Sequence, residues 1–108
     1  LEGGAGEHTC AVEPFSQGVS RDGRSLFTVS LSPSYPRAPY ELRIGSLPAG
    51  MTVAFNRSEG TAPDRVRLIA AAAKDAHAGS FTVVVIYREI QPAGVVLVST
   101  CRVNFIVE

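Results

Sequence analysis

Residues 80–88 read SFTVVVIYR and form the most strand-like stretch of the chain. β-Branched and aromatic residues dominate it, and these residue types favour an extended backbone. The stretch is apolar at odd and even positions alike, which is typical of a strand that is covered on both faces. Gly79 precedes it as a turn residue. We therefore expect a central strand here, with the rest of the chain organised around it.

Six other segments are short runs in which apolar and polar residues alternate, and turn residues separate them. In residues 40–44, YELRI, the apolar side chains fall on one face and the charged ones on the other. Seven strands joined mainly by short turns predict two packed antiparallel sheets. Besides the central strand, the expected strands are His8–Phe15, Arg24–Ser32, Tyr40–Ile44, Met51–Phe55, Asp64–Ala71 and Gly94–Val107.

Residues 65–78 fit two patterns. The alanine run at 70–73 favours a helix, and Gly79 is placed where a helix would end. The same residues also alternate as a strand, with arginines outward and Val66 and Leu68 inward. We expect a strand that ends at Ala71, followed by a tight turn or one helical turn over residues 74–78. A helix in place of the strand would make the fold α+β.

Composition restricts the class of protein. The chain has 108 residues, which is the size of one domain. Ten basic and ten acidic residues balance to zero net charge, so we expect no binding to nucleic acid and no attraction to an anionic membrane. The apolar runs are far too short to cross a bilayer. Residues 1–7 are glycine-rich and lack periodicity, so we expect a linker or a cloning remnant there and the domain over residues 8–108.

The two cysteines, Cys10 and Cys101, lie near opposite ends of the chain and fit no metal-ligand or redox spacing. A disulfide between the first and last strands and a pair of buried free thiols both agree with this placement. Strand parity favours the disulfide, because both cysteines fall on the apolar face of their strands. Such a bond closes nearly the whole chain into a loop and persists in an oxidising compartment.

The expected class is all-β: an immunoglobulin-like sandwich of about seven antiparallel strands in two sheets. Antibody domains are excluded, because the chain has no tryptophan and its cysteines are too far apart in sequence for the antibody pattern.

The region from Leu42 to Tyr87 also carries a family resemblance. It contains LRIGSLPAGMTVAF at residues 42–55, RVRLIA at 65–70 and AGSFTVVV at 78–85. This pattern resembles the immunoglobulin-like modules of bacterial secreted and surface proteins, including those attached to α-galactosidase-type hydrolases. The resemblance implies a spacer, stabilising or binding module without catalytic residues.

Residues with catalytic or metal-binding chemistry are sparse. The two histidines are His8 and His77, and no Gly-x-Ser-x-Gly elbow is present. His77 beside Asp75 is typical of a solvated turn. The carboxylates are scattered and form no calcium-binding run. We expect no enzyme activity, no resident metal and no cofactor.

Residues 33–40, PSYPRAPY, carry a proline at every third position. This spacing suits a polyproline II conformation that would display Tyr35 and Arg37. The segment is either a recognition loop, with Tyr35, Arg37 and Tyr40 as its contacts, or a stiff connection whose prolines discourage aggregation. The stiff connection is the favoured interpretation.

The sequence thus favours a non-catalytic spacer, docking or stabilising module of a secreted or surface bacterial protein. Its expected partners are neighbouring domains or an extracellular protein, and its expected location is extracellular, on the cell surface or periplasmic. The alternative is an adhesin-like or carbohydrate-binding module that recognises a glycan or protein through Tyr35, Arg37 and Tyr40.

Overall fold

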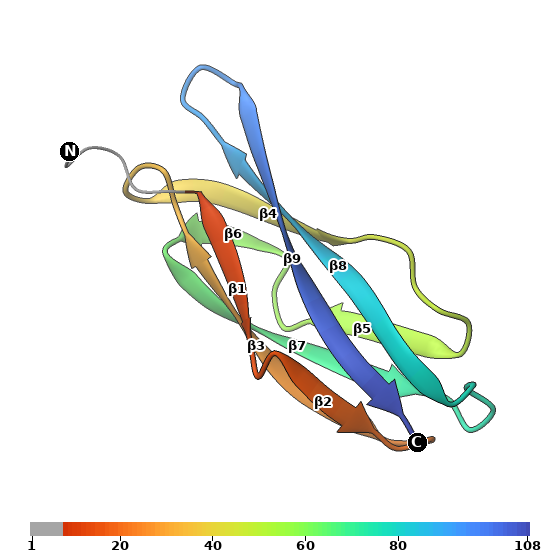
Figure 1. Ribbon diagram of the computed structural model, residues 1–108. Helices are drawn as coiled ribbons and strands as arrows, with labels where there is room; N and C mark the ends of the chain where they lie inside the picture. Colours follow the sequence, from red (N-terminus) through yellow and green to blue (C-terminus); the bar gives the residue numbers. More distant parts are fainter. Residues whose placement is uncertain (1–7) are drawn as a thin grey trace.

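The computed structural model describes residues 8–108, which form nine strands in two sheets (Figure 1). One sheet has the order β1-β3-β7-β5 and the other the order β2-β9-β8-β4-β6. Within residues 8–108 there is no helix, and hence none that could span a membrane. The strands are β1 (Thr9–Glu13), β2 (Ser16–Val19), β3 (Arg24–Ser32), β4 (Ala38–Ile44), β5 (Met51–Phe55), β6 (Glu59–Ala62), β7 (Asp64–Ala72), β8 (Gly79–Ile90) and β9 (Val96–Val107). The linker predicted for residues 1–7 lies outside the described residues.

The beginning of the chain contributes a strand to each sheet. β1 pairs antiparallel with β3, and β2 pairs parallel with the end of β9. The chain passes from one sheet to the other at Glu13 and Pro14, which are joined by a cis peptide bond. The first and last strands of the chain therefore meet at one edge of the sandwich (Figure 1).

The core follows the period of two that the sequence predicts. β3 buries alternate residues, as do β7, β8 and the second half of β9. Full burial of each large apolar side chain contributes about 1.5–3 kcal/mol, so this alternation is the main source of stability. The largest fully buried apolar and aromatic side chains are Tyr40, Tyr87, Phe27, Phe105, Leu68, Val19, Val29, Val66, Val83, Val85 and Val103.

The stretch that predicts a central strand forms β8, which lies between β9 and β4. The odd-numbered side chains Val83, Val85 and Tyr87 are completely buried between the sheets. On the opposite face, Val84 and Ile86 are half-buried. The expected position is confirmed, although the outer face is only partly covered.

The ambiguous residues 65–78 form strand β7 and then a turn, so the expectation of an all-β fold is confirmed. Ala70 and Ala72 point into the core, while Ala71 faces outward. A backbone hydrogen bond of 3.1 Å from the Ala76 amide to the Ala73 carbonyl closes the turn. The alanines are therefore small strand residues that alternate between the core and the outer face, and they do not form a helix.

Two strands were not expected from the sequence, β2 and β6. β2 has four residues, and its Ser-Gln-Gly stretch has the composition of a turn. It forms a strand because it pairs with residues far away in the chain. β6 consists of Glu-Gly-Thr-Ala with three exposed residues, and it forms only by adding to the edge of β4. Neither strand has an apolar alternation that would reveal it.

Residues 47–50, Leu-Pro-Ala-Gly, form a tight turn before β5. The Met51 amide donates to the Pro48 carbonyl at 3.1 Å, and Gly50 adopts φ +80°. A Cβ atom at position 50 would lie 3.0 Å from the Cα of Ala76. Gly50 is thus required both for its left-handed conformation and for the close approach of the turn after β7.

Candidate functional site

A disulfide between Cys10 and Cys101 joins the two sheets. Cys10 lies on β1 beside β3, and Cys101 lies on β9 beside β8. Their Cα atoms are 5.8 Å apart although 91 positions separate them in sequence. Both residues pack against the hydrophobic core, as strand parity predicts. The bond fastens the first strand of one sheet to the last strand of the other.

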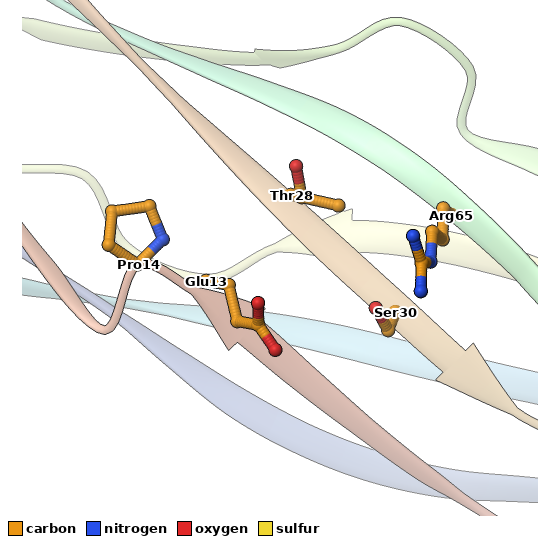
Figure 2. A pocket seen from close by; sticks show the side chains of 5 residues that line it. All are labelled: Glu13, Pro14, Thr28, Ser30 and Arg65. Carbon is orange, nitrogen blue, oxygen red and sulfur yellow. The ribbon is translucent and has the colours of Figure 1, made fainter.

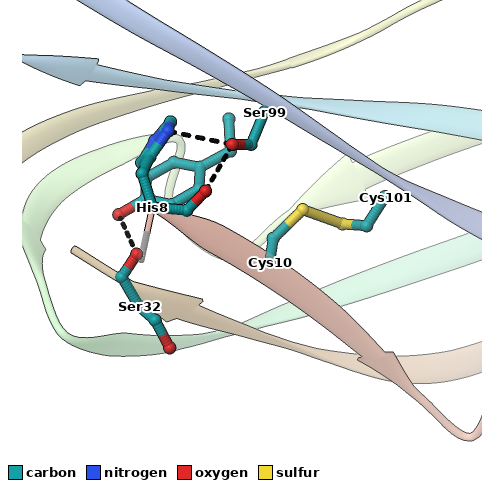
Figure 3. The surroundings of a disulfide bond; sticks show 6 residues. His8, Cys10, Ser32, Ser99 and Cys101 are labelled. Atoms are coloured by element: carbon teal, nitrogen blue, oxygen red, sulfur yellow. Dashed lines mark hydrogen bonds between the residues drawn. A yellow bond between two sulfur atoms is a disulfide. The ribbon is translucent and has the colours of Figure 1, made fainter. Parts of the chain in front are cut away.

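A polar cluster lies next to the disulfide (Figure 3). The His8 ring packs on Tyr87 with the ring centroids 4.0 Å apart, and the Tyr87 hydroxyl donates to the Ser32 carbonyl at 3.3 Å. Ser99 donates its hydroxyl proton to the carbonyl of His8, while its oxygen lies 2.9 Å from His8 Nδ1. These contacts connect the start of β1 to β8 and β9, and they connect β8 to the end of β3.

His8 is partly buried and is contacted by Ser99 at two points. The Ser99 oxygen lies within hydrogen-bond distance of both the His8 carbonyl and Nδ1, and Nε2 is buried without a partner within residues 8–108. Burial lowers the pKa of His8 below its ordinary value of 6.5, and the negative charge of Glu89 offsets part of this shift. Burial thus favours a neutral His8, which Ser99 contacts at both the ring and the carbonyl.

Glu89 is a buried carboxylate, with 0% of its surface exposed. One oxygen accepts from the Ser34 amide at 2.7 Å, and the other accepts from the Ser34 hydroxyl and the Gln91 side-chain amide. The two Ser34 donors attach the β3–β4 connection to the end of β8, and the Gln91 donor comes from the residue that follows β8. No motif in the sequence singles out Glu89. Its odd position after Val85 and Tyr87 was the available signal, because it predicts an inward side chain.

Tyr40 is not part of an exposed recognition loop, which corrects one element of the predicted binding site. Only 2% of its surface is exposed, because it occupies an inward position of β4. Its hydroxyl donates to Asp64. Burial and this hydrogen bond raise the pKa of Tyr40 to about 12.

Asp64 connects Tyr40 to the β5–β6 turn. Arg57 donates to both carboxylate oxygens of Asp64, at 2.9 Å and 2.7 Å. The Arg57 guanidinium holds the pKa of Asp64 below its ordinary value of 3.8, in spite of partial burial. The network therefore fastens one turn to the core and is a structural rather than a reactive arrangement.

The two other predicted contact residues lie in the turn between β3 and β4. Tyr35 is half-buried, and its hydroxyl donates to the Ile90 carbonyl. Arg37 is exposed and has φ 58°, so the segment bends into a turn instead of continuing as polyproline II. The structure thus favours the interpretation as a strand connection. A ligand role for Tyr35 and Arg37 stays a prediction.

A shallow groove of about 450 Å³ lies on the outer face of the four-stranded sheet (Figure 2). Side chains from β1, β3 and β7 line it together with the residue after β1. The groove combines an acid, a base and two hydroxyls, so it offers hydrogen-bond donors and acceptors to a polar ligand. The lining residues are Glu13, Pro14, Thr28, Ser30 and Arg65.

Within residues 8–108, no group of three or more histidine, cysteine, aspartate or glutamate side chains is placed to hold a metal ion. His77 is exposed in the turn between β7 and β8, as the sequence predicts, and His8 lies in the cluster beside the disulfide.

Comparisons with known proteins identify the fold. No known protein family and no curated protein matches the chain. Among solved structures, domains 4 and 5 of the S-layer protein SbsC align with a TM-score of 0.60 and 16% identity, over 91% of this chain and 44% of that one. WR4, a C. elegans member of the MSP family, aligns with a TM-score of 0.63 and 15% identity, over 94% of this chain and all of that one.

The periplasmic chaperone SfaE aligns with a TM-score of 0.52 and 11% identity, over 92% of this chain and 56% of that one. This chain spans less than half of the S-layer fragment that it matches. At such low identity, these alignments and the two-sheet arrangement establish that the chain has an immunoglobulin-like β-sandwich fold.

Proposed function

We propose that this chain is a non-catalytic structural or interaction module of a secreted or surface bacterial protein, where it acts as a spacer, docking or stabilising domain. The observation that carries the proposal is the disulfide between β1 and β9. A covalent link between the two sheets resists separation of the ends of the chain, which is useful in a protein outside the protection of the cytoplasm.

The location follows from redox chemistry. Disulfides of this kind persist in the periplasm and outside the cell, whereas cytoplasmic reductants keep thiols reduced. Proteins described as an S-layer protein and as a periplasmic chaperone share the fold, which supports a position outside the cytoplasm.

The chemistry of the polar groups supports a non-catalytic role. Ser99 contacts both the ring and the carbonyl of His8 and so joins the start of β1 to β9. The buried Glu89 carboxylate is occupied by three donors from its own chain. The conspicuous polar groups of the domain are therefore used to join strands and connections to one another.

Fractionation of the native organism tests this proposal. The protein should be found in the envelope or extracellular fraction, and alkylation of the denatured, unreduced protein should modify neither cysteine. Recovery in the cytoplasm with two alkylated thiols would contradict the proposal.

A second candidate function is glycan binding, which the outer groove favours. Its acid, base and hydroxyl groups match the donors and acceptors of a sugar. A glycan array should then show binding that Arg65→Ala abolishes, whereas Tyr35→Ala would abolish it if the β3–β4 turn were the site. Absence of binding to every glycan on the array rules out this second function.

A further inference from the structure

The β8–β9 hairpin extends beyond the other strands (Figure 1). β8 pairs with β9 along its whole length, from Val96 to Val107. On the other side of β9, β2 pairs only with residues 104–107. Among the strands of residues 8–108, none therefore pairs with this side of β9 from Val96 to Val103.

The hydrogen-bond pattern shows which backbone groups this open edge presents. At the hairpin turn, the Gln91 amide donates to the Val95 carbonyl at 2.7 Å, so this pair is of the hydrogen-bonded type. Antiparallel pairs alternate between hydrogen-bonded and non-hydrogen-bonded types. Val96, Val98 and Thr100 consequently point their N–H and C=O groups away from β8. Ile90 is the partner of Val96 on β8, and its carbonyl points away from β9, as the alternation requires. This carbonyl accepts a hydrogen bond from the Tyr35 hydroxyl instead.

Exposed apolar side chains gather along this edge. The end of the hairpin, residues 90–98, carries four of the eight large hydrophobic residues that are exposed within residues 8–108, and Val98 is 58% exposed. Phe15, the most exposed of the eight at 75%, lies just before β2 at the other end of the open edge. The four hairpin residues are Ile90, Val95, Leu97 and Val98.

Over residues 95–101 the edge lacks the features that normally prevent strand pairing. Proteins block exposed edges with charges, prolines or very short strands. β6 is four residues long, contains Glu59 and is followed by Pro63, and β1 ends at Glu13 and Pro14. Residues 95–101 of the hairpin read VVLVSTC and contain neither a charge nor a proline. The exposed Arg102 is the first charged residue along this edge, and the uncharged stretch before it is suited to accept another strand.

We propose that a second copy of this chain pairs with the open edge, β9 against β9, antiparallel and about a two-fold axis at Val98. In this register, Val98 lies opposite Val98 of the second copy, and Val96 lies opposite Thr100. All of these residues have outward-pointing backbone groups, so the two strands exchange hydrogen bonds and join two five-stranded sheets into one.

Three observations favour a second copy over a different protein. A two-fold interface needs a surface that complements itself, and this edge has an apolar hairpin at one end and an exposed phenylalanine at the other. The axis at Val98 brings the hairpin turn of each copy towards Phe15 of the other. The zero net charge of the chain removes long-range repulsion between copies. The inference rests on the unpaired backbone of β9 and stands independently of the proposed function.

Sedimentation equilibrium on the oxidised full chain tests the proposal. The apparent mass should rise from one chain towards two as the concentration increases over roughly 10 µM to 1 mM, the range of a small interface. Val98→Pro should weaken association at least about tenfold, because it removes an outward N–H at the centre without removing a bond to β8. Val98→Lys should have a similar effect through its charge.

Leu26→Lys is the matched control, because Leu26 is a comparably exposed apolar residue, at 48%, on the other sheet. It should associate as the wild type does. As a direct test of register, Val98→Cys should form an intermolecular disulfide under mild oxidation, whereas Leu26→Cys should not. A wild-type chain that stays monomeric overturns the proposal and leaves the edge for a strand of another protein. A dimer that persists in both Val98→Pro and Val98→Lys overturns it as well.

Discussion

The carboxylate of Glu89 lies inside the sandwich because its own chain supplies the donors that water would otherwise provide. The Ser34 amide, the Ser34 hydroxyl and the Gln91 amide all point at it. A buried polar group satisfied in this way costs little, whereas removal of its partner leaves unpaired donors behind. Glu89 therefore holds the β3–β4 turn against the end of β8.

Replacement of this carboxylate should be more damaging than removal of one donor. Glu89→Ala leaves three donors without an acceptor and opens a cavity, so we expect a loss of about 2–4 kcal/mol in the free energy of unfolding. Ser34→Ala keeps the backbone amide bond and should cost only about 1 kcal/mol. Urea denaturation measures both variants, and equal losses would contradict the role given to Glu89.

Asp64 should make stability depend on pH. Its pKa in the folded state lies below the ordinary value of 3.8, because Arg57 stabilises the charged form. The contribution of the ionised Asp64 carboxylate to the free energy of unfolding is therefore fully present above about pH 4. It is lost as the pH falls through the folded-state pKa of Asp64. Asp64→Asn should cost about 1–2 kcal/mol at pH 7, and the difference from wild type should shrink towards pH 2.

Chemical denaturation at several pH values measures the effect of Asp64→Asn. Asp75→Asn serves as the control, because Asp75 is exposed in the turn after β7. It should leave the free energy of unfolding nearly unchanged. A constant difference between Asp64→Asn and wild type across the pH range would show that the ion pair contributes nothing.

At the scale of the element, β7 shows how alanine serves a strand. Ala70 is completely buried between neighbours on β3 and β5, whereas Ala71 faces outward. Ala70→Val should overpack the core and cost about 1–3 kcal/mol. Ala71→Val adds a β-branched residue to the outer face and should be neutral or stabilising by up to about 1 kcal/mol. Urea denaturation of the pair checks this, and equal effects would contradict the strand register.

Most of the elements could be predicted from the sequence because they bury alternate residues. The same alternation placed both cysteines inward and resolved the alanine run as a strand. It also placed Tyr40 on one face with Leu42, and this signal was right, whereas the proline spacing before Tyr40 wrongly suggested an exposed contact. Strand alternation and proline spacing gave conflicting expectations for Tyr40, and its burial agrees with strand alternation.

The remaining features depend on contacts that leave no local pattern. β2 and β6 are short and polar, and each exists only because a longer strand supplies its hydrogen bonds. The outer groove combines residues from three strands, and its composition is ordinary for a sheet surface. The Glu89 and Asp64 networks join positions 55 and 24 residues apart, respectively, so no spacing in the sequence reveals them.

At the scale of the whole molecule, one covalent bond links the two ends of the fold. With 91 positions between the cysteines, the entropy model assigns the disulfide a stabilisation of about 4–5 kcal/mol, and measured cases are commonly about 2–4 kcal/mol. Cys10→Ala combined with Cys101→Ala should therefore lower Tm by at least about 8 °C. Reductant should lower the wild-type Tm to a similar value and leave that of the double variant unchanged.

The central claim is that Cys10 and Cys101 are bonded to each other across the two sheets, and intact-mass spectrometry tests it most directly. The protein is denatured and alkylated without reductant, and a second sample is reduced first. The account predicts no added alkyl group in the first sample and two in the second. Two alkyl groups in the unreduced sample would contradict it, because the sandwich would then contain two free thiols.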